Sequence, residues 1–491
     1  SYKAEEVIPI TITFSEAVNV TGTPQITLET GETDAVVNYS SGTGTSTLTF
    51  NYTVAAGHTS ADLDYVATTS LALNSGTIKD AGLNVATLTL PAIGAAGSLA
   101  VNKAIVIDTT VPTVAITSTT TGVSDGSTTS NTTIALTFTT SESTTDFIVG
   151  DITVGNGALS SFTAVSGTSY TATFTPTGPG ACTIDVAADK FTDGASNDNT
   201  ASDQFNWTFD NVAPTVTNVT STKADGSYKA EEVIPITITF SEAVNVTGTP
   251  QITLETGETD AVVNYSSGTG TSTLTFNYTV AAGHTSADLD YVATTSLALN
   301  SGTIKDAGLN VATLTLPAID AAGSLAVNKA IVIDTTPPTV AITSTTTGVS
   351  DGSTTSDTTI ALTFTTSSST TDFIVEDITA TNGALSSFTA VSGTSYTATF
   401  TPTGPGACTI DVAADKFTDG ASNDNTASDQ FNWTFDNVAP TVTNVTSTKA
   451  DGTYGTGVSV PITVTFSEAV NVTGTPQITL ETGTSDAVVN Y

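Results

Sequence analysis

The chain repeats itself with a period of 226 residues, and this repeat constrains its architecture more than any other feature. Residues 1–226 and 227–452 differ at only seven positions, and a third copy begins at Thr453. Repeats of this kind are typical of arrays in which each unit is a structural module of its own. Near-identical duplication favours a spanning or multivalent role, because an enzyme rarely needs its active site twice. The seven differing pairs are Gly94/Asp320, Val111/Pro337, Asn131/Asp357, Glu142/Ser368, Gly150/Glu376, Val154/Ala380 and Gly155/Thr381.

Each 226-residue copy contains two kinds of module. Type A carries the sequence TFSEAV and type B carries FNWTFD, and both close with an aspartate shortly before a proline, at Asp108–Pro112 and Asp210–Pro214. We interpret these segments as linkers, because proline stiffens a short connection and ends a strand ladder. The predicted domains are type A at 1–109 without its first strand, type B at 110–211, type A at 212–335, type B at 336–437 and part of a type A domain at 438–491.

The local pattern predicts β-strands throughout. Ile8, Ile10, Ile12 and Phe14 alternate with smaller or polar residues, and glycine, asparagine, aspartate and serine separate such runs. Alternation with a period of two indicates half-buried antiparallel strands. About seven strands in 100–120 residues is the size of an immunoglobulin-like sandwich. The sequence therefore predicts an all-β chain of tandem immunoglobulin-like β-sandwich domains in an extended array.

Charge and composition exclude several classes of function. The chain has 47 acidic residues against 10 lysines, no arginine and a formal charge of −37, which would repel nucleic acid and anionic membranes. No apolar run approaches the 18 residues of a membrane-spanning helix, and no signal peptide opens the sequence. Two histidines, two cysteines and no methionine leave little for general-base or thiol chemistry. We therefore expect no enzymatic activity.

The cysteines, histidines and tryptophans have structural interpretations. Cys182 and Cys408 lie one in each copy and alternate with apolar residues, which predicts small buried core residues without disulfides. His58 and its copy His284 lie in a polar turn and are expected at the surface. Trp207 and its copy Trp433 alternate with phenylalanines, which favours core packing over an exposed carbohydrate-binding surface.

Carboxylates converge where one domain enters the next. In a seven-stranded sandwich the B–C and F–G loops lie beside the preceding linker, and both module types place a glutamate in the first loop and an aspartate/asparagine turn in the second. Side chains that supply only oxygen suit a hard cation, and looser coordination favours Ca²⁺ over Mg²⁺. Ordinary solvated turn aspartates remain the alternative. The predicted ligands at this end are Glu16, Asp80, Asn84, Asp108, Glu142, Asp193, Asn197, Asp210, Glu242, Asp306, Asn310, Asp334, Asp419, Asn423, Asp436 and Glu468.

The E–F loop at the other end adds further candidates. Asp62 and Asp64, with their copies Asp288 and Asp290, are expected near the exit linker, where they could complete the same site. Ser368 replaces Glu142 in the second copy. We therefore predict weaker calcium binding at 334–340 than at 108–114.

Several of these phrases resemble the bacterial immunoglobulin-like repeats of giant secreted adhesins. The resemblance rests on SEAVNVTGTPQITLE at 15–29, DTTVP at 108–112, SYTATFTP at 169–176, FTD at 191–193 and FDNVAP at 209–214. It covers essentially the whole chain and implies an extracellular stalk, often stiffened by calcium. The family turn reads Asp-x-Ala-Gly-Asn, whereas the glycine is shifted in Asp80-Ala-Gly-Leu-Asn84.

The sequence thus predicts a non-enzymatic stalk of a large bacterial surface protein, with the neighbouring repeats of the same chain as partners. We expect the given residues to be a window from a longer array, because both ends interrupt a domain. An extracellular filament or sheath built from identical chains, and carbohydrate binding by single modules, are the alternatives. Scattering with and without calcium is the measurement that separates a stiffened stalk from a filament.

Overall fold

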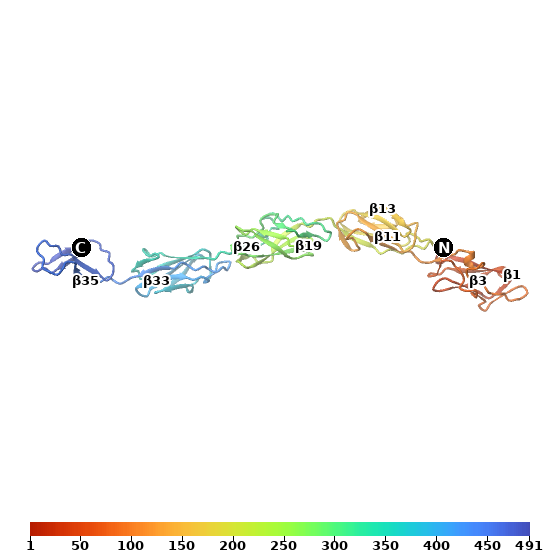
Figure 1. Ribbon diagram of the computed structural model, residues 1–491, viewed down its shortest axis with the longest axis horizontal. Coiled ribbons are helices and arrows are strands. Elements are labelled where there is room, and N and C mark those ends of the chain that lie inside the picture. The colour runs from red at the N-terminus through yellow and green to blue at the C-terminus, as the bar shows by residue number, and fades with distance from the viewer.

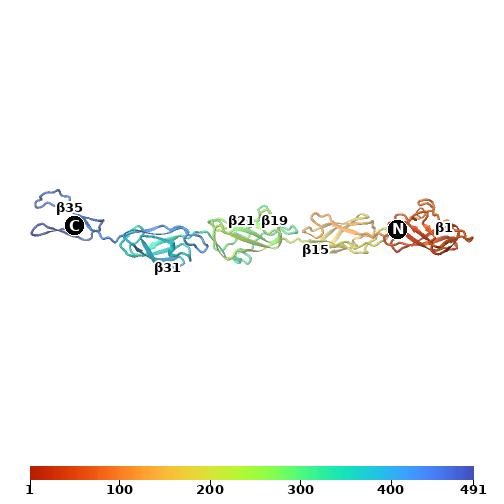
Figure 2. The ribbon, with the colours of Figure 1, turned by 90° about the horizontal axis from the view of Figure 1, so that it is seen from below.

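The computed structural model describes residues 1–491 as an extended row of β domains joined end to end (Figures 1 and 2). Consecutive domains contact each other only around the short linkers, and the first residues lie beside the junction between the first two domains (Figure 1). Four hydrophobic cores of 18, 17, 24 and 17 buried residues follow one another along the chain. The predicted fold class, tandem β-sandwich domains in an extended array, is confirmed.

The first type A domain is built on a six-stranded sheet in the order β6-β2-β3-β4-β1-β7, with β5 and β8 paired at its exit. Its strand β1 is long because it continues through an irregularity between Thr13 and Val18, pairing first with β4 and then with β7. The elements are β1 (Val7–Thr21), β2 (Gln25–Leu28), β3 (Ala35–Ser41), β4 (Thr45–Thr53), β5 (Thr59–Ser60), β6 (Leu71–Ala72), β7 (Thr77–Lys79), α1 (Leu99–Asn102) and β8 (Ile107–Asp108).

The first type B domain is a sandwich of two four-stranded sheets, ordered β13-β14-β11-β9 and β10-β16-β15-β12. Trp207 fills its centre edge-on to Phe174, with ring centroids 4.7 Å apart. The elements are β9 (Val114–Ser118), β10 (Ser127–Thr129), β11 (Ile134–Thr140), η1 (Val149–Asp151), β12 (Ile152–Gly155), β13 (Gly157–Ser166), β14 (Ser169–Pro176), β15 (Gly180–Val186) and β16 (Phe205–Phe209).

The second type A domain has a seven-stranded and a three-stranded sheet. Strand β17 pairs with β19, and no strand occupies the corresponding edge of β1 in the first copy. The elements are β17 (Val216–Ser221), β18 (Gly226–Tyr228), β19 (Val233–Thr247), β20 (Gln251–Leu254), β21 (Ala261–Ser267), β22 (Thr271–Thr279), β23 (Thr285–Ser286), β24 (Leu297–Ala298), β25 (Thr303–Lys305), α2 (Leu325–Asn328) and β26 (Ile331–Asp334).

The second type B domain repeats the first, and residues after 440 form two separate two-stranded sheets. No residue after Phe435 belongs to a buried core. The elements are β27 (Val340–Ser344), β28 (Ser353–Thr355), β29 (Ile360–Thr366), η2 (Val375–Asp377), β30 (Ile378–Thr381), β31 (Gly383–Ser392), β32 (Ser395–Pro402), β33 (Gly406–Val412), β34 (Phe431–Phe435), β35 (Val442–Ser447), β36 (Ile462–Phe466), β37 (Gln477–Leu480) and β38 (Ala487–Asn490).

The predicted alternation describes the core well in the second copy and less well in the first. Ile238 and Phe240 are 0% and 2% exposed, whereas their counterparts Ile12 and Phe14 are only half-buried. The difference follows from β17, which covers this part of β19. Burying a large apolar side chain is worth about 1.5–3 kcal/mol. A covering strand therefore adds substantially to the stability of a type A domain.

The predicted positions of the cysteines and tryptophans are confirmed, and that of the histidines is confirmed in part. Cys182 and Cys408 are fully buried and form no disulfide, and burial raises the pKa of both thiols. Trp207 and Trp433 are each 2% exposed, so that both belong to the core. His58 is only partly exposed, because its Nδ1 lies 2.8 Å from the Tyr52 hydroxyl. The histidine thus packs against the end of the domain instead of standing free in solvent.

Two features of the pairing are not evident in the sequence pattern. Strands β10 and β16 pair in parallel, as do β18 and β26, although simple alternation is usually taken as a sign of antiparallel strands. In both cases a short early strand runs beside the last strand of the domain. That pairing brings the start of a type A domain next to its exit linker.

Candidate metal centres at the domain junctions

Each linker begins with an aspartate whose side chain folds back on the linker itself. The Oδ1 atom of Asp108 accepts a hydrogen bond from the backbone N–H of Thr110 at 3.1 Å. Local turns of this type are a common use of aspartate. The turn fixes one carboxylate at the point where the chain leaves the first domain. The same bond is made by Asp210 with Val212, by Asp334 with Thr336 and by Asp436 with Val438.

A serine at each junction holds the far end of the linker by hydrogen bonds. The N–H of Thr113 donates to the Ser141 hydroxyl at 2.9 Å, and the N–H of Ser141 donates to the Thr113 carbonyl oxygen at 2.9 Å. Because Glu142 follows directly, this clamp fixes its backbone against the entering chain. The reciprocal pair recurs at Thr215–Ser241, Thr339–Ser367 and Thr441–Ser467.

The predicted loop position of the glutamate is correct for type B domains and wrong for type A domains. Glu142 follows the end of β11 in a loop. Glu16 and Glu242 instead lie inside β1 and β19, at the irregularity where each strand leaves one partner for another. A bulge of this kind bends a strand without ending it. It therefore directs the glutamate toward the linker as a loop would.

The third part of each junction is a turn that contains an aspartate and an asparagine. Its residues are hydrogen-bonded to one another and to the linker. Asp193 accepts hydrogen bonds at Oδ1 from the N–H groups of Ala195 and Asn197, at 2.8 and 2.9 Å. The Asn197 side-chain amide donates to Asp193 Oδ2 and to the carbonyl oxygen of Asp108, both at 2.9 Å. The bond to Asp108 joins one domain to the next without any metal.

These bonds add a positioning role to the one predicted for the asparagines. Asn310 donates to the carbonyl oxygen of Asp210 at 2.8 Å, and Asn423 donates to that of Asp334 at 2.9 Å. Asn84 donates to Asp80 at 2.6 Å. Because the amide nitrogen faces carbonyl and carboxylate oxygens, these side chains position the linker and the neighbouring aspartate. These bonds engage the amide nitrogens and not the Oδ1 atoms, so that a ligand role for Asn84, Asn197, Asn310 and Asn423 stays a prediction.

The shifted glycine does not change the conformation of the turn. Leu83 and Leu309 have φ of 65° and 69°, and Ser196 and Ser422 occupy the same place in type B domains with φ of 65° and 66°. Leucine in this left-handed region is strained by roughly 1–2 kcal/mol. The turn is thus conserved between module types despite a residue that resists it.

At two junctions the three carboxylates meet. Oxygen atoms of Asp108, Glu142 and Asp193 all lie within 4.8 Å of one another, and the second cluster consists of Asp210, Glu242 and Asp306. Burial, followed by the negative charges of Asp108 and Asp193, raises the pKa of Glu142 above its usual range. Burial and the charges of Asp210 and Asp306 act in the same direction on the pKa of Glu242.

The chemistry of these clusters fits a hard divalent cation. All the donors are oxygens, the aspartates of the turns are nearly buried, and no lysine lies inside either cluster to neutralise the charge. Carboxylates held this close repel one another, and a divalent cation would remove that repulsion. The predicted convergence of linker, glutamate and turn is therefore present at both complete junctions.

The other residues predicted at this end of the domains form no cluster of three carboxylates. The junction of Asp334 and Asp419 has Ser368 in place of the glutamate and forms no group of three carboxylates. Asp436, Glu468, Glu16 and Asp80 belong to neither group of three carboxylates.

The residues of the E–F loop do not join the junction clusters. Asp64 and Asp290 are each 6% exposed and point into their own domains, where each Oδ1 accepts the N–H of the following tyrosine at 2.9 Å. Asp62 and Asp288 are exposed and belong to neither cluster. The chain turns Asp64 and Asp290 inward to meet α1 or α2, away from the junction, and the part of Asp62 and Asp288 in the inter-domain site stays a prediction.

A lysine that the sequence pattern does not indicate contacts the next domain at each junction from type A to type B. Lys3 Nζ donates to the carbonyl oxygen of Ser196 at 2.8 Å and lies 4.0 Å from Asp198, and Lys229 donates to Ser422 at 2.7 Å. The parallel strand beside the exit linker carries these lysines to the junction. Their position 193 residues before the acceptor gives no sequence signal.

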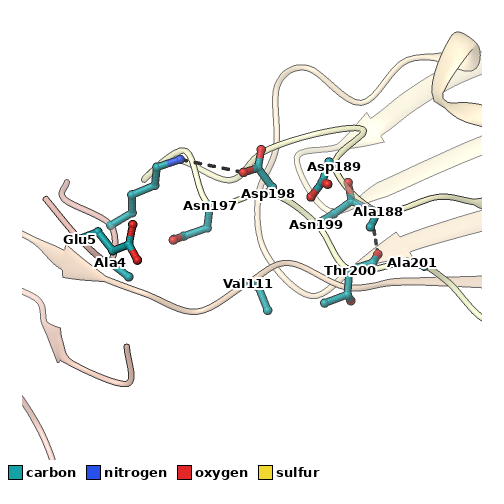
Figure 3. A pocket seen from close by; sticks show the side chains of 11 residues that line it. Ala4, Glu5, Val111, Ala188, Asp189, Asn197, Asp198, Asn199, Thr200 and Ala201 are labelled. Atoms are coloured by element: carbon teal, nitrogen blue, oxygen red, sulfur yellow. Dashed lines mark hydrogen bonds and ion pairs between the residues drawn. The ribbon is translucent and has the colours of Figure 1, made fainter. Parts of the chain in front are cut away.

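A polar groove of about 560 Å³ lies beside this lysine contact. Figure 3 shows Glu5 on one domain facing Asp198 and Asp189 on the next, with Val111 of the linker at the base; the dashed line to Asp198 is the ion pair with Lys3. Acidic groups thus surround the junction on this side too. No helix of the structure is long and apolar enough to cross a membrane.

The sheets and junctions define a tandem array of immunoglobulin-like β-sandwich domains. Residues 108–209 and 334–435 match a family described as the bacterial Ig-like domain. The chain therefore contains bacterial Ig-like domains, and the two matched segments, which are the type B units, make up less than half of it.

Solved structures give weaker similarities. The crystal structure of invasin, a bacterial integrin-binding protein, is 16% identical with a TM-score of 0.26, covering 73% of this chain and 68% of that chain. The D0-D1 domain of intimin is 16% identical with a TM-score of 0.15, covering 45% of this chain and 99% of that chain. No curated protein matches the sequence. With TM-scores this low, the fold assignment depends on the sheets described above and on the family match.

Proposed function

We propose that this chain is a non-enzymatic spacer region of a large bacterial extracellular protein, stiffened by Ca²⁺ at its domain junctions. The observation that carries the proposal is the meeting of three carboxylates at each of two junctions, within 4.8 Å. One carboxylate comes from the linker and two come from the following domain. A cation between them would tie the two domains together, and it would supply electrostatic attraction where there is otherwise repulsion.

The arrangement of domains supports a mechanical role. The domains follow one another in a nearly straight row, so that length grows with every repeat (Figure 2). The linkers are short. Each begins with an aspartate whose side chain accepts a hydrogen bond from the linker backbone, and each ends at a proline next to a residue that is hydrogen-bonded to the following domain. Such connections restrict bending even before a cation binds. A charge of −37 keeps neighbouring chains apart and the row extended.

Small-angle scattering of the whole chain in calcium and in chelator tests this proposal. We expect a long, well-defined maximum dimension in calcium and a broader, shorter distribution in chelator. The double variant Glu142→Gln, Glu242→Gln should behave in calcium as the parent does in chelator. Identical profiles for the parent in both conditions would contradict calcium stiffening and reduce the clusters to solvated turn residues.

Lateral assembly into a filament or sheath is the second candidate. The edge strands β13 and β31 are ten residues long and carry exposed Val165 and Val391, each 66% exposed. Both strands are interrupted by a register shift beside Ser161 and Ser387, which have positive φ. Bulges of this kind protect edges from pairing. Growth of the scattering particles with protein concentration would nevertheless favour the filament over the spacer.

A further inference from the structure

Each type A domain contains a second group of polar atoms, inside the domain and apart from the junction. In the first copy Asp64 is 6% exposed and Ser98 is fully buried. The Asp64 Oδ1 atom accepts hydrogen bonds from the N–H groups of Tyr65 and Leu99, at 2.9 and 3.3 Å. Its other oxygen, Oδ2, and the Ser98 hydroxyl have no hydrogen-bond partner at all.

The same two orphaned atoms occur in the second copy, at Asp290 Oδ2 and Ser324 Oγ. Ser324 precedes helix α2 but its side chain does not cap the helix, so the hydroxyl is free for another partner. A buried polar atom without a partner costs about 1–3 kcal/mol, and more when it carries charge. Because Leu99, the residue after Ser98, donates to Asp64 Oδ1, the two unpartnered atoms lie in the same region of the domain, and a bound cation could satisfy both.

The second copy adds an exposed carboxylate whose charge acts on this place. Asp320 stands where the first copy has Gly94, with φ of 58° against 70° for the glycine. The pKa of Asp290 is raised above its usual range. Burial is the main cause, and the charge of Asp320 adds to it, while hydrogen bonds from backbone N–H groups act in the opposite direction. A second negative charge near enough to act on a buried carboxylate is unfavourable, and a bound cation would compensate it.

We propose that each type A domain holds a divalent cation inside the domain, on the free carboxylate oxygen of Asp64 or Asp290 and the neighbouring serine hydroxyl. In the second copy the negative charge of Asp320 adds to the attraction for a cation, so that this site binds more tightly than that of the first copy. Ordered water would supply the remaining ligands, as is usual for calcium. The site is independent of the junctions and would exist even if the junction clusters bound nothing.

The two copies supply a matched exchange for testing this proposal. Calcium binding is measured by titration calorimetry on the whole chain, in a background of Glu142→Gln and Glu242→Gln that weakens the junctions. Asp320→Gly should weaken one internal site about tenfold, and Gly94→Asp should strengthen the other about tenfold. Each substitution installs a residue that the other copy already accommodates, and a Cβ on Gly94 meets no atom within 4 Å.

Two further variants separate a bound cation from a bound water molecule. Ser324→Ala removes the hydroxyl alone and should also weaken binding at the second copy, whereas Asp288→Asn removes an exposed charge two residues from Asp290 and should not. If neither the Asp320/Gly94 exchange nor Ser324→Ala changes the isotherm, the orphaned atoms bind only water and the proposal fails. It also fails if Asp288→Asn has the same effect as Asp320→Gly, because the effect would then be one of overall charge.

Discussion

Lys3 Nζ lies 2.8 Å from the carbonyl oxygen of Ser196 in the next domain, and the copy of this contact, Lys229 to Ser422, measures 2.7 Å. The second contact is intact although its junction has Ser368 in place of a glutamate. No lysine makes such a bond at the junction of Asp210. Junctions from type A to type B thus have a lysine hydrogen bond between the two domains, which needs no metal. The junction from type B to type A has no such lysine and relies on the hydrogen bond from Asn310 to the Asp210 carbonyl oxygen and on the carboxylate cluster.

Removing both lysines should loosen only the junctions from type A to type B. In chelator, Lys3→Ala with Lys229→Ala should broaden the distribution of inter-domain distances, measured by scattering or by paired spin labels across each junction. The expected loss is about 1.5–3 kcal/mol per hydrogen bond to a charged group, reduced by solvent exposure. Lys103→Ala, an exposed lysine with no side-chain bond, is the control. A change at the Asp210 junction instead would contradict this division.

Exchanging Glu142 and Ser368 between the two junctions from type A to type B should exchange their affinity for calcium. Glu142→Ser should weaken binding at the Asp108 junction by tenfold or more, because one of three carboxylates is lost. Ser368→Glu should create comparable binding at the Asp334 junction, where the turn and linker bonds are already in place. Calorimetry with CaCl₂ measures both. If Glu142→Ser leaves the affinity unchanged, Glu142 is not a ligand.

Gly308 is required by the close approach of the linker. A Cβ at this position would lie 2.8 Å from the carbonyl oxygen of Asp210. Gly308→Ala should therefore push the linker away, at an overpacking cost of about 1–3 kcal/mol, and lower calcium affinity at this junction. Gly82→Ala in the first copy is the matched control, since its Cβ would meet only side chains of its own turn, at 3.3 Å. Equal effects of the two substitutions on calcium titrations would show that the linker is not the obstacle.

The acid stability of type B domains should depend on Asp146 and its copy Asp372. Burial would raise the pKa of Asp146, but hydrogen bonds from Thr144 and Thr192 outweigh burial and hold that pKa below its usual range. A lowered pKa in the folded state means that ionisation stabilises the domain above the ordinary aspartate value of about 4. This contribution is lost as the pH falls through the lower folded value.

Asp146→Asn with Asp372→Asn should therefore destabilise the type B domains at pH 7 and make little difference at pH 2. Thermal unfolding followed by the fluorescence of the buried tryptophans, in chelator, measures this for both type B domains at once. Asp203→Asn with Asp429→Asn removes the same number of exposed charges and is the control. A destabilisation that is equally large at both pH values would mean that lost packing, and not ionisation, causes it.

Much of the architecture follows from the sequence because it depends on local patterns. The repeat fixes the number and kind of modules, and alternation such as that of Phe205, Trp207 and Phe209 fixes which side chains face the core. The residues of each junction cluster could also be predicted, since strands that alternate in direction must bring alternate loops to the same end of a sandwich. Asp108, Glu142 and Asp193 meet for this reason.

Other features depended on contacts that no local pattern encodes. The lysine hydrogen bond between domains arises only because a short strand pairs in parallel with the last strand of its domain, which carries Lys3 to the next domain. Asp62 and Asp64 are two residues apart in one loop, yet only Asp64 turns inward, where the N–H of Leu99 at the start of α1 donates to its carboxylate. The sequence by itself determined which modules exist and which loops converge, because periodicity and strand direction are properties of the chain. The tertiary structure decided which carboxylates are buried apart from the junctions and which junctions a lysine bridges, because both depend on hydrogen-bond partners distant in sequence.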